Sequence, residues 1–580
     1  MSRSPVRKTS AKKNQSLKAF FRGEWEHTLR EHPVLASRMG DRRYNDRWDD
    51  LSLDAYARRE EHERRVLKHL SGLDPATLSD ADRLNCRLFL RECRMDLGIY
   101  RHRLHLLTLN QLGGIQTASQ LADEFPLETA ADYRDWIARL RAFPGFMDQM
   151  IALMRAGIEA GVIHPKVVLE RVADQIETQI TEDPEQSPFY KPFGQIPREI
   201  GSKERGRLAA DGKRAIRDAV VPAFRRFREF FGAEYLPAGY DKVGMWQFPR
   251  GRQAYAHLVR MFTTTDLTPD EVHRIGKREV RRIGAEMKKV MKRTGFRGGL
   301  KGFMRFLRTD PRFFYKTGEE LLQAYRALAK RIDPAVVRLF RRLPWIPYGV
   351  EPVPKHLEPH MPAAFYRRPA ADGSRAGSFF VNLYQVETRP KYEMAVLTLH
   401  EAVPGHHLQI AHSMELKGLP EFRRYGGYTA FIEGWGLYSE SLGEELGLFD
   451  DPYWKFGQLT FEMWRAVRLV VDTGIHYHAW SRRKAIEYCV VNCARSPQDM
   501  VNEVDRYIAM PGQALAYKIG ELKIQELRER GRRALGKRFD IRAFHDAILG
   551  QGAVTLEVLE SQVKAWIRSA AKGASGRSKP

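Results

Sequence analysis

The chain has 580 residues, 43% of them hydrophobic, which is enough for a large buried core and excludes an intrinsically disordered protein. Its formal net charge is +24, yet no recognised nucleic-acid-binding motif accompanies the basic residues, so a nucleic-acid partner is not expected. There is no run of eighteen apolar residues and no apolar stretch behind the basic N-terminus, which predicts a cytoplasmic protein without a membrane partner. Nothing in the composition indicates an oligomeric state.

The two ends of the chain are basic and lack the apolar periodicity of packed elements. Residues 1–16 and 568–580 are therefore predicted to be disordered tails. Residues 17–343 have a mostly helical pattern, in which the capping box Thr268-Pro269-Asp270-Glu271 marks the start of one helix. The cysteines form two pairs, Cys86 with Cys93 and Cys489 with Cys493, whose spacings are typical of buried thiols on helices rather than of disulfides.

Residues 344–390 contain eight of the chain's 30 prolines, which makes helix unfavourable there. The run from Gly377 to Tyr384 predicts a strand, and a second strand is expected near residues 363–367. Together they predict a small antiparallel sheet. Asn382 lies on the first of these predicted strands and is a candidate for holding substrate backbone, because peptidases commonly bind substrate as an added strand.

Residues 391–567 return to a helical pattern and contain the motif His400-Glu401-Ala402-Val403-Pro404-Gly405-His406-His407. In metallopeptidases with a His-Glu-x-x-His motif, the two histidines bind zinc and the glutamate is the general base. Here Pro404 occupies the position of the second histidine, so the second ligand has to be His406 or His407.

The geometry of an unbroken helix disfavours both candidates. His406 would lie about 240° around the axis from His400, and His407 would lie about 10 Å along it. Pro404 must break the helix, however, and Gly405 tolerates the backbone that such a break requires. A widened turn can bring His406 back toward His400, but this reasoning alone leaves His407 as an alternative.

A third ligand is expected from the segment Glu433-Gly434-Trp435-Gly436-Leu437-Tyr438-Ser439-Glu440. Small residues beside Glu433 allow its helix to approach another helix closely, as a ligand from a second helix requires. Glu440 lies two turns further on the same face and is a candidate for orienting a ligand histidine.

Polar residues nearer the C-terminus are candidates for stabilising an oxyanion beside the metal. They include His476, Tyr507 and Tyr517. Arg465 and Arg468 could either meet a substrate carboxylate or pair with acidic side chains.

The motif from His400 to His407, the segment around Glu433 and the segment from Pro511 to Tyr517 together resemble the bacterial domain-of-unknown-function family 885. That family is grouped by similarity with the gluzincin metallopeptidases. The resemblance extends over nearly the whole chain from Phe20. It implies a mostly helical, cleft-bearing fold with zinc on His400, His406 and Glu433. Helical gluzincins typically stabilise the oxyanion with a Tyr or His of the C-terminal half, which favours Tyr517 and His476.

The sequence therefore predicts a mostly α-helical zinc metallopeptidase in which Glu401 is the general base, the cofactor is Zn²⁺ and the substrate is a peptide. The small sheet is expected beside the zinc helix. Two other functions stay open: a zinc hydrolase of non-peptide amides or esters, and a non-catalytic protein that binds nucleic acid. A structural zinc site is disfavoured, because such a site has four protein ligands and needs no base.

Overall fold

The computed structural model describes residues 5–572 except 126, 356–357, 359–360, 371–372 and 374, without the side chains of residues 5–16. The chain forms two compact units, residues 1–254 and residues 255–580. The boundaries predicted at 343 and 390 both fall inside the second unit. The helical pattern is the same on either side of residue 255, so it does not show which helices pack together.

The first unit is helical and is organised around the long helix α5. Its core contains Trp136, Phe143 and Met147 of α5, which are buried together with Phe224 and Phe227. Its helices are α1 (Pro5–Glu31), α2 (Pro33–Arg38), α3 (Leu53–Ser71), α4 (Asp80–Arg101), α5 (Ala130–Ala160), α6 (Lys166–Glu177), α7 (Ser202–Ala215), α8 (Val221–Phe230) and α9 (Leu236–Ala238).

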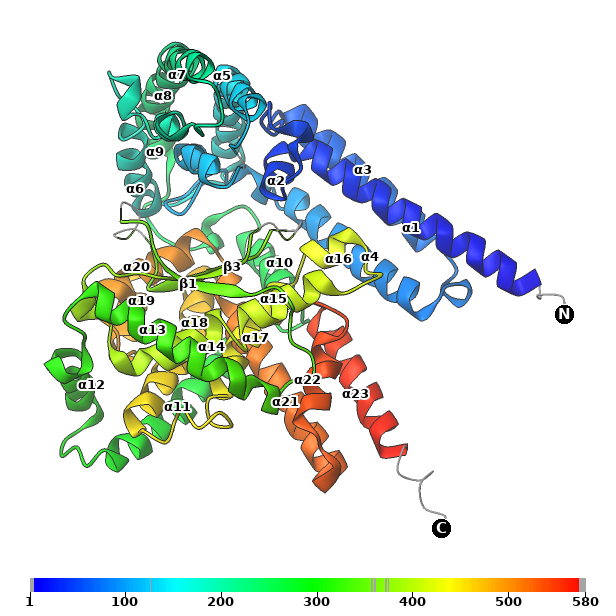
Figure 1. The fold of residues 1–580 in the computed structure, drawn as a ribbon, viewed down its shortest axis with the longest axis vertical. Coiled ribbons are helices and arrows are strands. Elements are labelled where there is room, and N and C mark those ends of the chain that lie inside the picture. The colour runs from blue at the N-terminus through cyan, green and yellow to red at the C-terminus, as the bar shows by residue number, and fades with distance from the viewer. Residues whose placement is uncertain are drawn as a thin grey trace. The chain divides into compact units, whose positions relative to one another are not determined.

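The second unit contains the three strands and the remaining helices, with the unit boundary inside α10 (Figure 1). These helices are α10 (Gly251–Thr263), α11 (Pro269–Arg293), α12 (Leu300–Thr309), α13 (Gly318–Ile332), α14 (Met394–Glu401), α15 (His406–Glu415), α16 (Glu421–Tyr425), α17 (Thr429–Ser441), α18 (Pro452–His476), α19 (Arg482–Asn492), α20 (Pro497–Ala509), α21 (Ala516–Leu535), α22 (Ile541–Leu549) and α23 (Leu556–Lys572). The mostly α-helical class predicted from the sequence is confirmed.

Two close helix pairs form the frame of this unit: α11 packs along α18, and α17 packs along α21. A Cβ atom on Gly276 of α11 would lie 2.7 Å from the Cβ of Leu469, so this contact requires glycine. The predicted capping box starts α11, with Thr268 Oγ1 accepting from the Glu271 amide and the Glu271 carboxylate accepting from the Thr268 amide. Because α11 packs along α18, residues 255–343 are part of the same unit as the zinc motif and not of the N-terminal unit.

The sheet has three strands, β1 (Tyr348–Pro352), β2 (Ala364–Arg367) and β3 (Gly377–Val381), in the order β1-β3-β2. The two predicted strands are present as β2 and β3 and pair antiparallel. The sheet is mixed rather than purely antiparallel, because β1 pairs parallel with β3. A five-residue strand that contains Gly349 and ends at Pro352 has too weak a pattern to be expected from the sequence.

The predicted tails only partly coincide with structural boundaries. Helix α1 begins at Pro5, inside the segment 1–16, and α23 continues to Lys572. Residues 1–4 and 573–580 lie outside the described residues. Cys86, Cys93, Cys489 and Cys493 are all free and buried, as their spacing predicts. Across the described part of the chain, no helix is both long and apolar enough to span a membrane.

Candidate metal centre

The zinc motif folds as two helices separated by a sharp turn. Helix α14 ends at Glu401, α15 begins at His406, and residues 402–405 connect them. Pro404 has no amide hydrogen to continue the helix. A Cβ atom on Gly405 would lie 1.9 Å from the carbonyl oxygen of His400, so only glycine fits between the two helix ends.

Three side chains from three helices converge at this turn: His400 of α14, His406 of α15 and Glu433 of α17. Glu433 Oε2 lies 3.6 Å from His400 Nε2 and 3.5 Å from His406 Nε2. All three donor atoms lie within 4.8 Å of one another, and no other group of three potential metal ligands does so among the described residues. Two donors on one tetrahedral zinc ion are about 3.4 Å apart, so these separations match a shared ion.

The imidazole of His400 is held in place on its other side. Its Nδ1 lies 2.8 Å from Oε1 of Glu440, which is completely buried. The same Oε1 lies 3.5 Å from a guanidinium nitrogen of Arg465 on α18. Glu440 therefore fixes the ring orientation and places the proton on Nδ1, which leaves Nε2 as the free donor.

The charges at this centre are poised for a cation. Burial alone would lower the pKa of His400, but hydrogen bonds to Glu433 and Glu440, together with the charge of Glu401, raise it to about 9. Burial would raise the pKa of Glu433, but His406 and His400 hold it well below its ordinary value. Buried acids thus stabilise a positive charge between the two rings, where a metal ion would also lie.

The donor set fits zinc, and the site is not fully enclosed. Two imidazoles and one carboxylate are the ligands of hydrolytic zinc sites, in which a fourth position stays free. The side chain of Glu433 is 19% exposed, and Glu401 is partly exposed beside His400. Solvent can therefore reach one side of the three donors, as a hydrolytic site requires and a closed structural site does not.

His407 points to the sheet and away from the three donors. Its Nδ1 lies 3.0 Å from the hydroxyl of Tyr366 on β2, and its ring packs 4.8 Å from the ring of Tyr348 on β1. Burial lowers the pKa of His407 to about 4. The geometry therefore selects His406 over His407 as the second candidate ligand, and His407 anchors α15 to the sheet.

Glycines bring the Glu433 helix close to its neighbours. A Cβ atom on Gly434 would lie 2.5 Å from the Cα of Gly520 on α21, and one on Gly436 would lie 2.7 Å from the His400 ring. Trp435, to which the sequence assigned no role, donates from Nε1 to the Pro404 carbonyl at 2.8 Å. One helix thus supplies Glu433, makes room for His400 and holds the turn between the two histidines.

The oxyanion candidates do not gather around the three donors as a group. His476 is buried with its Nε2 2.9 Å from the Tyr507 carbonyl oxygen, and its ring stacks on Tyr255. The Tyr507 hydroxyl accepts from Trp464 at 3.1 Å and from Arg468 at 3.2 Å. Arg465 and His476 lie at opposite ends of a twelve-residue stretch of α18, about 16 Å apart along its axis, so the helix does not bring His476 beside Arg465, which contacts Glu440 at the His400 ring.

Tyr517 remains the oxyanion candidate that the fold favours. It lies in the first turn of α21, the helix that packs along the Glu433 helix, and is partly exposed. Its ring lies 4.5 Å from the guanidinium carbon of Arg468.

Asn382 holds the protein's own backbone rather than a substrate. Its Nδ2 donates to the carbonyl oxygens of Glu358, Met361 and Pro362 at 2.8, 2.9 and 3.2 Å. Its Oδ1 accepts from the Tyr384 amide at 2.9 Å, and the side chain is completely buried. Moreover, β3 is the central strand and has no free edge. A polar residue at a strand end can satisfy a loop as readily as a ligand, so the predicted substrate contact is wrong.

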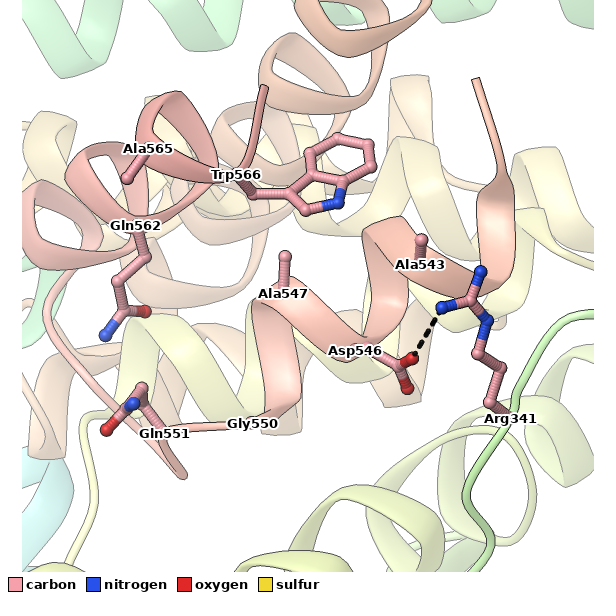
Figure 2. A pocket seen from close by; sticks show the side chains of 9 residues that line it. All are labelled: Arg341, Ala543, Asp546, Ala547, Gly550, Gln551, Gln562, Ala565 and Trp566. Carbon is pink, nitrogen blue, oxygen red and sulfur yellow. Dashed lines mark ion pairs between the residues drawn. The ribbon is translucent and has the colours of Figure 1, made fainter. Parts of the chain in front are cut away.

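A separate pocket lies between α22 and α23 and does not contain the metal centre. Its volume is about 480 Å³, and its lining includes Trp566 and Arg341. Figure 2 shows Arg341 directed towards Asp546, and the two form an ion pair of 3.6 Å. The pocket lining combines small residues such as Ala543 and Ala547 with larger ones such as Gln562 and Trp566. It offers no arrangement of donors comparable to His400, His406 and Glu433.

The chain is similar to proteins whose activity has no description. The family described as "Bacterial protein of unknown function (DUF885)" matches residues 33–563. A solved structure from Colwellia psychrerythraea, of a protein provisionally named a lipoprotein, has a TM-score of 0.90 at 27% identity and covers 96% of this chain and 99% of its own. A second, from Shewanella oneidensis, is a provisionally named lipoprotein of unknown function with a TM-score of 0.74. It is 15% identical, covers 93% of this chain and 98% of its own, and is a likeness of fold alone. No curated protein matches the chain.

Proposed function

We propose a function for this chain, which belongs to the DUF885 family of bacterial proteins of unknown function: it is a zinc-dependent metallopeptidase, distantly related to the gluzincins. The observation that carries the proposal is the convergence of His400, His406 and Glu433 at zinc-ligand spacing from three helices. Glu401 follows the first of these donors directly, on the side that solvent reaches.

Zinc held by two imidazoles and one carboxylate supplies Lewis-acid activation of water and of the scissile carbonyl group. The protein's own residues supply the remaining steps. Glu401 accepts the proton of the attacking water on its carboxylate and delivers it to the nitrogen of the leaving amine. Glu440 keeps the proton of His400 on Nδ1, so that Nε2 stays a lone-pair donor throughout. Tyr517 is the proposed hydrogen-bond donor to the developing oxyanion.

The test separates metal binding from catalysis. Purified protein is expected to contain one zinc ion per chain, and removal of zinc by a chelator is expected to abolish hydrolysis of unmodified peptides. Glu401→Gln is expected to retain zinc and to lose peptide hydrolysis by about 10²- to 10⁴-fold. Glu387→Gln removes an equal charge from an exposed position on the same unit and serves as the matched control.

Two results would contradict the proposal. The first is wild-type protein without metal after expression in zinc-supplemented medium; the second is full activity of Glu401→Gln. Zinc binding together with hydrolysis of simple amides or esters, but of no peptide in a broad mixture, would favour the alternative hydrolase. A cytoplasmic location stays part of the proposal and is checked by fractionation of the native host.

A further inference from the structure

Buried Arg468 and partly buried Arg506 share one acid. Arg468 of α18 and Arg506 of α20 both point to Oε2 of Glu503, at 3.1 Å and 3.6 Å. Two guanidinium groups and one carboxylate leave a net positive charge. The neighbouring carboxyl of Asp472 accepts hydrogen bonds from Tyr255 and Gly512, and burial raises its pKa to about 7, so it is only partly ionised at neutral pH.

Both arginines also keep an unused donor. The NH1 nitrogens of Arg468 and Arg506 are buried and have no acceptor within hydrogen-bond distance among the described residues, although NH1 of Arg506 is also the atom that lies 3.6 Å from Glu503 Oε2. Arg468 as a whole is only 3% exposed. A buried, charged donor without a partner is costly, and an Arg fork suits a carboxylate best. The pair therefore lacks one anion of about carboxylate size.

The neighbouring arginines each contact acids of their own, although Arg465 Nε and Arg495 Nε and NH1 also lack an acceptor within hydrogen-bond distance among the described residues. Arg465 contacts Glu440, and Arg495 lies 3.7 Å from Glu393 and 3.9 Å from Asp499. The positive charge that no carboxylate balances thus lies on Arg468 and Arg506.

The arginine pair lies just past the end of the zinc helix. Gly457, early in α18, contacts the backbone of Tyr392 just before α14, and Arg465 reaches His400 through Glu440. Helix α18 thus runs beside α14 in the same direction, and Arg468 lies three residues, about 4.5 Å along the axis, beyond Arg465. At that level α14 has already ended at Glu401, so Arg468 borders the space next to the donors.

Solvent reaches the pair from one side. The side chain of Arg506 is 21% exposed, and that of Glu503 is 19% exposed. The partly exposed ring of Tyr517, the proposed oxyanion donor, lies against Arg468. Solvent therefore reaches the side of this cluster formed by Arg506, Glu503 and Tyr517, and the two NH1 nitrogens lie buried behind it.

We propose that Arg468 and Arg506 bind a carboxylate of the peptide substrate, foremost its C-terminal carboxylate, so that cleavage occurs near the carboxyl end of the chain. This inference rests on the proposed peptidase function and gives it a substrate class. An extended peptide covers about 3.5 Å per residue, so one or two residues after the scissile bond span about 3.5 to 7 Å, which is comparable to a single turn of α18. An acidic side chain at the same distance offers the same chemistry.

The first experiment needs no variant. Wild-type zinc-loaded protein is given three matched peptides: one with a free C-terminus, one with a C-terminal amide, and an amidated one whose last residue is Glu. The free peptide is expected to have a kcat/KM at least tenfold higher than the amide. Restoration by the terminal Glu would identify a side-chain carboxylate as a second source. Equal rates for all three peptides would overturn the inference.

The second experiment assigns the effect to the arginine pair. Arg506→Gln is expected to lower kcat/KM at least tenfold for the free peptide and to leave the amide unchanged, and Arg506→Lys is expected to be intermediate. Arg483→Gln removes the same charge from a side chain that is 84% exposed and serves as the control. An equal loss on both peptides would assign Arg506 a structural role and reject the inference.

The two proposals fail in different ways. If the peptidase function is wrong, none of the peptides is hydrolysed, even by protein that contains zinc. If only the carboxylate subsite is wrong, zinc-dependent hydrolysis persists but does not distinguish the free from the amidated peptide.

Discussion

The contact between Gly436 and His400 makes a sharp test of the metal centre, because one methyl group would act directly on a ligand. In Gly436→Ala the new Cβ would lie 2.7 Å from His400 Cε1, 2.9 Å from Nε2 and 3.1 Å from Nδ1. Ordinary carbon contacts begin near 3.5 Å, so the ring would have to move by about 0.8 Å. The hydrogen bond from Nδ1 to buried Glu440 resists that movement.

The expected effect on zinc follows from the tolerance of metal coordination. Ligand distances vary by only about 0.2 Å, so a ring displaced by several times that distance coordinates poorly. We expect zinc affinity to fall at least 10- to 100-fold, as it does when the residue that orients a ligand histidine is mutated. This decrease corresponds to about 1.4 to 2.7 kcal/mol of binding free energy. In the metal-free protein, the crowded methyl group is expected to lower the free energy of unfolding by about 1 to 3 kcal/mol. Replacing a glycine inside a helix raises it by about 1 kcal/mol, which offsets part of that loss.

The assay is competition for zinc with a chromophoric chelator, alongside urea unfolding of the metal-free form. Gly302→Ala on α12 is the control, because nothing but an aromatic side chain 3.8 Å away lies near the new methyl group. It should keep wild-type zinc affinity and gain about 0.5 to 1 kcal/mol of stability. Unchanged zinc affinity in Gly436→Ala would refute the assignment of His400 as a ligand held at this contact.

Three further predictions concern the residues around the centre. In metal-free protein the pKa of His400 is raised from 6.5 to about 9, so its contribution to stability is full below pH 6.5 and is lost as the pH rises through 9. We expect the free energy of unfolding, measured with urea in the presence of a chelator, to fall by on the order of 3 kcal/mol over that pH range. If His400→Gln shows the same fall, His400 is not the group that causes it. His407→Phe should retain zinc by elemental analysis whereas His406→Phe should lose it; the reverse pattern would exchange their roles. Asn382→Ala should lower the free energy of unfolding by about 1 to 3 kcal/mol without changing KM, because its partners are the protein's own carbonyl groups, and a raised KM at unchanged stability would argue for a substrate contact.

The sequence predicts those parts of the centre that depend on local backbone chemistry. Pro404 and Gly405 specify a break between two histidines, and the glycines beside Glu433 specify a close helix contact, both of which the structure contains. What it could not predict depends on tertiary partners. Asn382 and His476 are polar residues close in sequence to predicted site residues. Only the fold reveals that both already contact backbone carbonyl groups of other segments through hydrogen bonds.

The same reasoning explains why the domain boundary was not visible. Helices 255–340 and helices 17–250 share one apolar pattern, since that pattern reports which face of a helix is buried and not which helix covers it. Which helix covers that face depends on single residues such as Gly276, where a methyl group would clash with α18.

Each donor of the metal centre has a support that does not involve the metal. Glu440 holds His400, the turn before His406 is fixed by Trp435 on the Pro404 carbonyl, and Glu433 is placed by the packing of Gly434 on Gly520. In a structural zinc site the ion itself holds the ligands in position, and its binding contributes directly to folding. Supports built from buried hydrogen bonds and helix packing keep the donors in position while one side stays open to solvent, which is the condition for exchanging substrate and product at a fixed ion. The way in which the donors are held, more than their chemical identity, therefore favours a catalytic centre over a structural one.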